Sequence, residues 1–406
     1  MKHVVFVTPF FGSNVLRCLK ALVELPNVRV GLITHEPDKY IPPFLKETLA
    51  GHFQIRNCGD ADQLILATRA FAKEWGHVDR LIGYLEQLQL PLAQAREALG
   101  LPGMHAESAR CFRDKNRMKQ VLGEAGLPVA AQALLRGAED AHRFVERVGF
   151  PVVLKPVAGV GTKDTLRASN DGELGRALNR LLPSRDNPVQ AERFVTGAEH
   201  TLEAVSIKGE VVWHSSTYYL PGPLQVVENP WMQYCVLLPR DRFLPHVESF
   251  RPLNAKALSA LGMETGLSHM EWFLPQDGAP VISEVAARPP GVNIMGMMGL
   301  AHEVDMWSKW AHLMVHEEFE VPERQWACGT AFLRGHGPGR AVSSVAGLEV
   351  VKELGDAVVE SRLPQVGQPR SSHYEGEGFV TLRMKETAQV VEGLKKVITK
   401  VQLSYR

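Results

Sequence analysis

One short segment combines the residue types that proteins use to hold phosphate. The run "PVVLKPVAGVGTKDT" (151–165) places Lys155 at the end of an apolar stretch, followed by Gly159, Gly161 and Thr162. The glycines let main-chain N–H groups approach an anion closely, and the lysine adds a positive charge. The run has neither the Gly-Lys-Ser/Thr of a Walker A loop nor the third glycine of the dinucleotide fingerprint. The alternative is a strand that ends in an ordinary turn, with the lysine in water.

Two glutamates occupy apolar runs that a short turn connects. Glu271 in "HMEWFL" and Glu284 in "VISEVA" are predicted to lie on adjacent antiparallel strands, where facing side chains approach to about 4.5–5.5 Å. Two carboxylates this close repel each other unless a cation lies between them, and Mg²⁺ prefers carboxylates together with phosphate oxygens. The pair therefore predicts a metal site; the alternative is two glutamates that face solvent.

A single arginine, Arg288, follows the second glutamate. Its guanidinium keeps its proton and presents a planar set of donors. Since a metal ion would neutralise the glutamates, we expect Arg288 to be free for a substrate-derived anion. The alternative is a structural ion pair with Glu303 or Asp305.

The elements that would position these residues begin with an alternation of strands and helices. The strand-like runs "HVVFVT", "VRVGLIT" and "VDRLIGY" are separated by helix-periodic segments, a pattern typical of a parallel sheet with helices on both faces. Residues 218–252 carry six prolines and are predicted to be rich in loops. From about residue 327 the chain is strand-rich again and ends in a helix. The fold class predicted is α/β (α+β overall).

The composition restricts the class of partner. Among 406 residues, 45 basic and 45 acidic side chains give a net charge of zero, which argues against nucleic acid or an anionic membrane as the partner. The five cysteines are scattered and no apolar run is long enough to span a bilayer. We expect a cytoplasmic protein that acts on small molecules, with a homodimer as a possibility.

Taken in order, the motifs over residues 113–294 resemble the ATP-grasp superfamily. The resemblance implies that Lys115, in the basic helix "DKNRMKQVLGEAGLPV", contacts phosphate together with Lys155, and that the loop "AGVGT" closes over the β- and γ-phosphates. It implies a hinge in "QAERFVTGAEHTLE", where one set of residues places main-chain groups against adenine: Glu192, Arg193, Phe194 and Val195. It further implies that Glu199 holds the ribose hydroxyls.

The resemblance also assigns the metal and the reacting groups. It implies ATP and Mg²⁺ as cofactors (with Mn²⁺ as an alternative), Glu271 and Glu284 as metal ligands, and contact between Arg288 and the transferring phosphoryl group. Many ATP-grasp enzymes read Glu-x-Asn-x-Arg at the second metal strand, but this chain has Ala286 in place of the asparagine. Either fewer protein ligands hold the metal, or Asn293 reaches in, or the metal is held loosely.

The layout resembles amino-acid ligases and their carboxylate–amine ligase relatives. It predicts a Rossmann-like domain over 1–110, a lid and hinge over 111–197, and a catalytic domain over 198–406 with a β-rich extension. The implied reaction is ATP-dependent formation of an amide or peptide bond through an acyl-phosphate. The alternatives are a carboxylase-like or purine-type member and a regulatory ATP-binding protein without turnover. The residues considered for substrate contact are His269, Asn293, Trp213 and Tyr218, with His214, Tyr219 and Trp231 from the same aromatic-rich stretch. Each of them has ordinary packing as its alternative.

Overall fold

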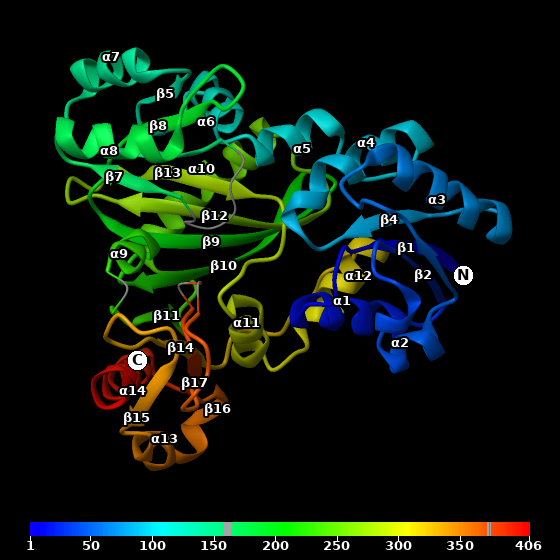
Figure 1. Cartoon of the computed structure of the whole chain (residues 1–406). Helices are drawn as coiled ribbons and strands as arrows, with labels where there is room; N and C mark the ends of the chain where they lie inside the picture. The colour runs from blue at the N-terminus through cyan, green and yellow to red at the C-terminus, as the bar shows by residue number, and fades with distance from the viewer. Residues whose placement is uncertain (158–163, 230, 372, 374) are drawn as a thin grey trace.

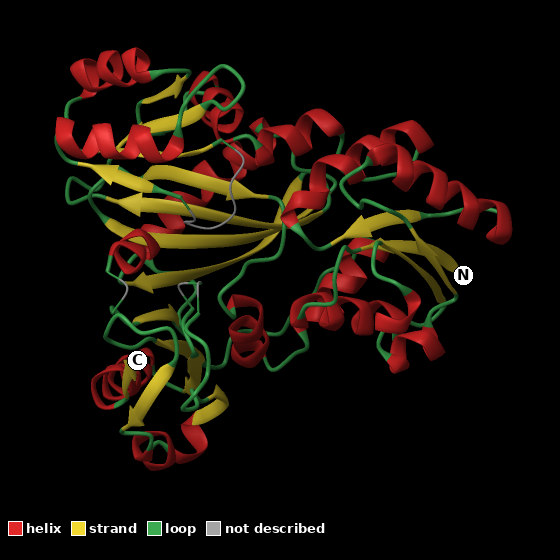
Figure 2. Cartoon of the chain, viewed as in Figure 1, coloured by secondary structure: helices red, strands yellow, loops and turns green. Residues whose placement is uncertain are grey.

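The structure is a computed structural model that describes residues 1–157, 164–229, 231–371, 373 and 375–406. In Figure 1 the N-terminal part lies on the right, a small sheet with its helices at the upper left, and the C-terminal part at the lower left. Figure 2 shows that the strands of one long sheet run through the middle of the molecule and that helices surround them.

The N-terminal part is a parallel sheet in the strand order β3-β2-β1-β4. Alternate residues of its central strand enter different cores: Val4 and Phe6 pack with α1, whereas Val5 and Val7 pack with α3 and α4. The predicted parallel sheet with helices on both faces is confirmed, while β3 was not among the predicted strands. The elements are β1 (Lys2–Val7), α1 (Ser13–Val23), β2 (Val28–Thr34), α2 (Pro43–Thr48), β3 (Gly51–Gln54), α3 (Ala61–Trp75), β4 (Arg80–Gly83) and α4 (Gln89–Leu99).

The second part is a small antiparallel sheet in the order β5-β8-β6-β7. Val152 and Leu154 pack beneath its two helices, α7 and α8. Strand alternation therefore turns Val153 and Lys155 to the opposite face. The elements are α5 (Ala106–Arg113), α6 (Lys115–Glu124), β5 (Gln132–Leu135), α7 (Ala138–Val148), β6 (Val152–Pro156), β7 (Leu166–Ala168), α8 (Asp171–Leu181) and β8 (Val189–Arg193).

The long central sheet has the order β13-β12-β9-β10-β11-β14-β17-β16. One face packs on α10 through Leu202, Met270 and Phe250. The other face packs against α11 and α12 toward one end. The elements are β9 (Ala198–Ile207), β10 (Glu210–Leu220), α9 (Pro223–Glu228), β11 (Tyr234–Leu238), α10 (Pro245–Ala260), β12 (Gly266–Leu274), β13 (Val281–Ala286), α11 (Ile294–His302), α12 (Met306–His316), β14 (Ala327–Leu333), β16 (Val358–Arg362) and β17 (Gly378–Met384).

The C-terminal strands continue this sheet, because β14 pairs with β11 and with β17. The strand-rich stretch from about residue 327 is therefore an extension of the central sheet, and α14 packs on it. The division into domains at residues 110 and 197 stays a prediction. The remaining elements are β15 (Val342–Ala346), α13 (Glu349–Glu353), α14 (Thr387–Lys400) and β18 (Gln402–Tyr405).

The stretch 218–252 is more regular than its prolines predicted. It contains the end of β10, then α9, β11 and the first half of α10. Pro223 and Pro245 stand in the first turn of α9 and α10, where the missing N–H of proline has no helical partner to lose. Pro252 lies inside α10. The prediction of a loop-rich excursion was wrong because these prolines mark helix starts as well as turns.

Burial lowers the pKa of three histidines, His200, His214 and His302, from 6.5 to about 4. The ring of His200 stacks on Trp272 with 4.6 Å between centroids. Neither of its ring nitrogens has a hydrogen-bond partner among the described residues. A proton on this ring would be poorly solvated in the folded state.

We expect the free energy of unfolding to fall as the pH drops from 6.5 toward 4. In this window the unfolded chain binds protons that the folded chain does not, whereas above pH 6.5 the rings are neutral in both states. Each histidine adds a slope of at most about 1.4 kcal/mol per pH unit. Thermal melts at pH 7 and pH 5 should therefore show a smaller loss of Tm for His200→Phe than for the wild type. The exposed His142→Phe serves as the control; equal losses in all three proteins would contradict the expectation.

No helix among the described residues is both long enough and apolar enough to cross a lipid bilayer.

Candidate active site

A cavity lies where the small sheet faces the central sheet. Its empty space measures about 1180 Å³, including solvent at the mouth. Residues from α6, β6, β8, β9, β12 and β13 meet in its wall. The predicted site residues among its lining are Lys115, Lys155, Glu192, Arg193, Phe194, Val195, Glu199, His269, Glu271, Glu284 and Arg288.

The position of Lys115 follows from the start of α6. Asp114 caps the helix by accepting hydrogen bonds from the main-chain N–H groups of Asn116 (2.9 Å) and Arg117 (3.0 Å). The main-chain N–H of Lys115 donates to the carbonyl of Val157 at 3.1 Å. This bond joins α6 to the end of β6 and brings two lysines, Lys115 and Lys155, to one wall of the cavity.

The buried lysines are paired with carboxylates. Nζ of Lys155 lies 3.0 Å from Oε1 of Glu192, and Nζ of Lys119 lies 3.5 Å from Oε2 of the same residue. Burial lowers the pKa of Lys119, whereas at Lys155 the neighbouring Glu192 and Glu284 outweigh burial and raise its pKa. These ammonium groups are thus buried at the cavity, where their electrostatic attraction for an anion is stronger than it would be in water.

Glu271 and Glu284 stand directly opposite each other in the antiparallel register of β12 and β13. The predicted cross-strand pair is confirmed. Nζ of Lys115 lies 2.5 Å from Oε1 of Glu284. Burial opposes ionisation of Glu284, but Lys115 and Lys155 outweigh it and hold the pKa of this carboxyl at about 2. The carboxylate of Glu284 is therefore charged at neutral pH.

Arg288 lines the cavity, but the expectation that it has no ion-pair partner was wrong. Its Nε donates to Oε2 of Glu86 at 2.8 Å, and its Nη1 donates to the carbonyl of Pro289 at 2.9 Å. Arg113 holds the other oxygen of Glu86. Neither Glu303 nor Asp305, the partners considered from the sequence, takes part in these contacts. The arginine is therefore oriented by a carboxylate from the N-terminal part of the chain.

The hinge residues 192–195 line the cavity, but two of their main-chain donors are already used. The N–H of Arg193 donates to Ala131 and that of Phe194 donates to Pro151. Burial and then Glu271 raise the pKa of the nearby Glu199 carboxyl to about 8. At neutral pH this side chain is mostly protonated and can donate as well as accept a hydrogen bond.

Several predicted residues lie elsewhere. The amide Nδ2 of Asn293 donates to Thr381 (3.1 Å) and Glu360 (3.2 Å) on the C-terminal strands, so it does not replace the missing asparagine. Tyr218 lies on the α10 face of the sheet, where its hydroxyl meets Nε2 of His246 at 2.8 Å.

Trp213 was also expected near the substrate, and the structure places it in the packed core instead. Its ring packs on His302 and Phe319. It lies six residues, or roughly 20 Å of strand, from the cavity end of β10. The predicted phosphate-loop residues Gly159, Gly161 and Thr162 lie outside the described residues.

Comparison with known proteins identifies this arrangement. The family model described as "Carbamoyl-phosphate synthase L chain, ATP binding domain" matches residues 114–205. The L-amino acid ligase of Bacillus licheniformis, a solved structure, covers 100% of this chain and 99% of its own at a TM-score of 0.78 and 20% identity. Residues 114–205 therefore match an ATP-grasp ATP-binding domain, and the whole chain has the fold of an ATP-grasp ligase. The predicted superfamily and fold are thereby confirmed.

Two further ATP-grasp relatives differ in their named reactions. The L-arginine-specific L-amino acid ligase of Bacillus subtilis is 22% identical over 253 residues, which are 60% of this chain and 59% of the relative. The biotin carboxylase domain of the Hydrogenobacter thermophilus 2-oxoglutarate carboxylase, solved with MgADP, ADP and bicarbonate, is 18% identical at a TM-score of 0.67, covering 99% of this chain and 90% of that one. The chain spans between 21% and 59% of the length of the first curated relatives.

One residue of this cavity, Lys119, was missed from the sequence. Lys119 follows Lys115 by one helical turn, so the helical spacing of the two lysines was a usable signal. Tyr219 lines the cavity and its hydroxyl lies 3.5 Å from Oε1 of Glu271. Of the two neighbouring tyrosines considered for substrate contact, Tyr219 faces the cavity and Tyr218 faces α10.

The side chains of this cavity fit a magnesium nucleotide. Two carboxylates face each other across adjacent strands, the ligand type that Mg²⁺ prefers alongside phosphate oxygens. The buried lysines Lys115 and Lys155, which line the same cavity, can bind phosphate oxygens.

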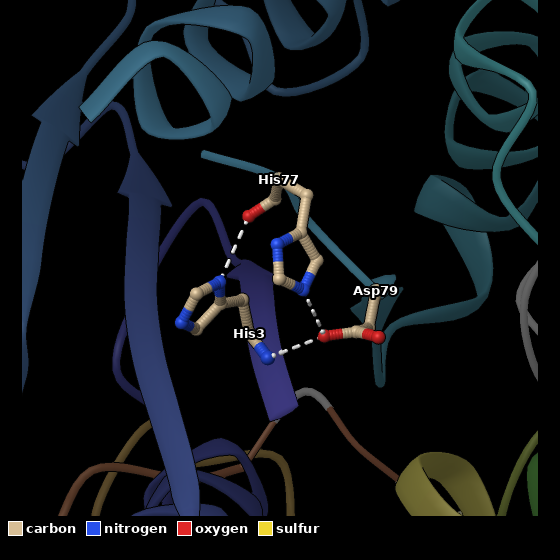
Figure 3. A group of neighbouring side chains, drawn as sticks. All are labelled: His3, His77 and Asp79. Atoms are coloured by element: carbon tan, nitrogen blue, oxygen red, sulfur yellow. Dashed lines mark hydrogen bonds and ion pairs between the residues drawn. The ribbon is translucent and has the colours of Figure 1, made fainter. Parts of the chain in front are cut away.

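A second group of metal-binding residue types lies on the N-terminal sheet, where His3, His77 and Asp79 have ligand atoms within 4.8 Å of one another (Figure 3). Its polar atoms already bond among themselves. Asp79 accepts from the main-chain N–H of His3 at 2.8 Å and lies 3.1 Å from Nζ of Lys2, while Nδ1 of His3 meets the carbonyl of His77 at 3.0 Å. These contacts connect the start of β1 to the start of β4. The ammonium of Lys2, already paired with Asp79, would repel a metal cation at this group.

Proposed function

We propose that this chain is an ATP- and Mg²⁺-dependent carboxylate–amine ligase that forms an amide or peptide bond. One observation carries the proposal: a single cavity brings together Glu271, Glu284, Lys115, Lys155 and Arg288. Phosphoryl transfer to a carboxylate requires little covalent chemistry from the protein, because positioning and charge neutralisation lower most of the barrier. This set of side chains can position the reacting groups and neutralise their charge.

The proposed reaction has two steps. A substrate carboxylate oxygen attacks the γ-phosphorus of ATP, the bond to the β-phosphate oxygen breaks, and ADP leaves. The amine nitrogen of the second substrate then attacks the acyl carbon, loses a proton, and inorganic phosphate leaves with the former carboxylate oxygen. The products are an amide, ADP and phosphate.

The side chains have separate roles in this scheme. Lys115 and Lys155 bind phosphate oxygens, and Glu271 with Glu284 holds the metal ion. That ion neutralises charge on the transferring phosphoryl group when it is bound. Arg288, oriented by Glu86 at 2.8 Å, faces the substrate carboxylate and stabilises the charge that develops on it. Glu199, with a pKa of about 8, bonds the ribose hydroxyls.

An ADP-release assay over pairs of amino acids tests the proposal. We expect release that depends on ATP, on Mg²⁺ and on both members of one pair, with mass spectrometry detecting the amide product. Two further assays test the alternatives. One replaces the amino acids with bicarbonate, and the other supplies an amine acceptor of the kind that purine-type members use. Release with bicarbonate alone would favour a carboxylase-like reaction. Tight ATP binding without release in any arm would favour a regulatory ATP-binding protein.

A further inference from the structure

The departure from the family pattern at Ala286 lies beside an unusual histidine. The strand register places three residues of adjacent strands in one row: Glu203 on β9, His269 on β12 and Ala286 on β13. The next row on the same face holds Glu271 and Glu284. The short side chain at 286 thus leaves space directly next to the imidazole of His269, on the face that carries both glutamates.

A buried carboxylate fixes the orientation of this imidazole. Nδ1 of His269 lies 2.9 Å from Oε1 of Glu203, a residue with no exposed surface. The other ring nitrogen, Nε2, lies 3.5 Å from Oε1 of Glu271. His269 and Glu271 both line the cavity. Glu203 therefore directs one nitrogen of the ring toward the carboxylate that was predicted to hold metal.

This geometry matches that of a metal-bound histidine. Ligand atoms about 2.0–2.2 Å from a common cation lie roughly 3–3.5 Å apart, which agrees with the separation of Nε2 and Oε1. Metal-binding histidines almost always donate their other N–H to a carboxylate, a carbonyl or a water. Glu203 has that role here, since its carboxylate is 2.9 Å from Nδ1.

We propose that His269 is a protein ligand of the divalent cation held by Glu271 and Glu284, in the place that Ala286 leaves without a ligand. This inference rests on the proposed function only in assuming a metal ion at the two glutamates. A nitrogen ligand suits Mn²⁺ and later transition metals better than Mg²⁺, which prefers oxygen. The site therefore prefers Mn²⁺ more strongly than a site built from carboxylates and an asparagine.

Electron spin-echo spectroscopy of Mn²⁺ bound to the full chain with ADP tests the assignment without using turnover. The measurements are made in a His3→Asn/His77→Asn background, so that the group of His3, His77 and Asp79 does not supply a competing histidine. We expect modulation from a directly bound imidazole nitrogen, which changes when the protein is labelled with ¹⁵N-histidine. The modulation should disappear in His269→Asn and persist in the control His142→Asn, an exposed residue.

A second variant addresses the role of Glu203. Glu203→Gln should weaken Mn²⁺ binding by about 10–100-fold, as is typical when the partner of a metal-bound histidine is changed, and should weaken Mg²⁺ binding less. Calorimetry gives both affinities, and ADP binding without metal controls for folding. Absence of histidine modulation in the parent protein, or modulation that survives His269→Asn, would overturn the assignment. Either result is independent of the ADP-release assay, so the ligase proposal and the ligand proposal fail separately.

Discussion

Glu284→Gln is expected to lower ADP release by about 10²–10³-fold, the cost typical of removing one preorganised electrostatic group. The amide keeps the shape of the side chain but removes the charge that binds the cation opposite Glu271. It also leaves Lys115 without the carboxylate that now lies 2.5 Å from its ammonium. Binding of ADP without metal should change little, because the hinge at 192–195 lies on β8 and the loop after it, apart from β13.

A matched variant shows whether the effect of Glu284→Gln on turnover comes from losing a metal ligand or simply from losing a buried carboxylate. Glu377 is 1% exposed and accepts hydrogen bonds from Tyr405 (2.6 Å) and from the main-chain N–H of Ser371 (2.8 Å), in the C-terminal part of the chain. Glu377→Gln should reduce thermal stability and leave turnover nearly unchanged. If Glu284→Gln released ADP at the wild-type rate, Glu284 would have no part in the reaction.

The glutamate pair could be predicted from the sequence because local features determine it. A short turn connects two apolar strands, so their register follows from the chain itself, and the structure has Glu271 opposite Glu284. The same reasoning predicted the N-terminal parallel sheet from alternating strands and helices. Lys155 was predicted to end an apolar strand, and it lies near the end of β6, where it lines the cavity; its contact with phosphate stays a prediction.

Other features depend on contacts that no local pattern encodes. Glu86 and Arg288 are 202 residues apart, and nothing near either residue indicates the other. A register shift between Val211 and Trp213 in β10 changes which face later residues of the strand occupy, so Tyr219 and not Tyr218 enters the cavity. Asn293 itself has a left-handed backbone, with a φ of 61°, and its amide donates to Glu360 and Thr381 on the C-terminal strands.

Arg288→Lys is expected to lower ADP release by about 10²–10³-fold with little change in ATP affinity. The guanidinium binds Glu86 through Nε and can present its remaining planar donors to an anion at the same time. A lysine has one compact ammonium, so a contact with Glu86 would draw it away from the substrate carboxylate. The loss should therefore appear in kcat and in the KM for the acid, while the KM for ATP stays close to the wild-type value.

Arg113 provides the matched control, because it holds the other oxygen of Glu86 and does not line the described cavity. Arg113→Lys weakens the same buried ion pair and should lower the Tm with a small effect on turnover. If both lysine variants lost stability equally and both kept wild-type turnover, Arg288 would be a structural partner of Glu86. A fall in turnover confined to Arg288→Lys, at equal loss of Tm, would instead place its guanidinium at the reacting carboxylate, since Glu86 is disturbed in both variants.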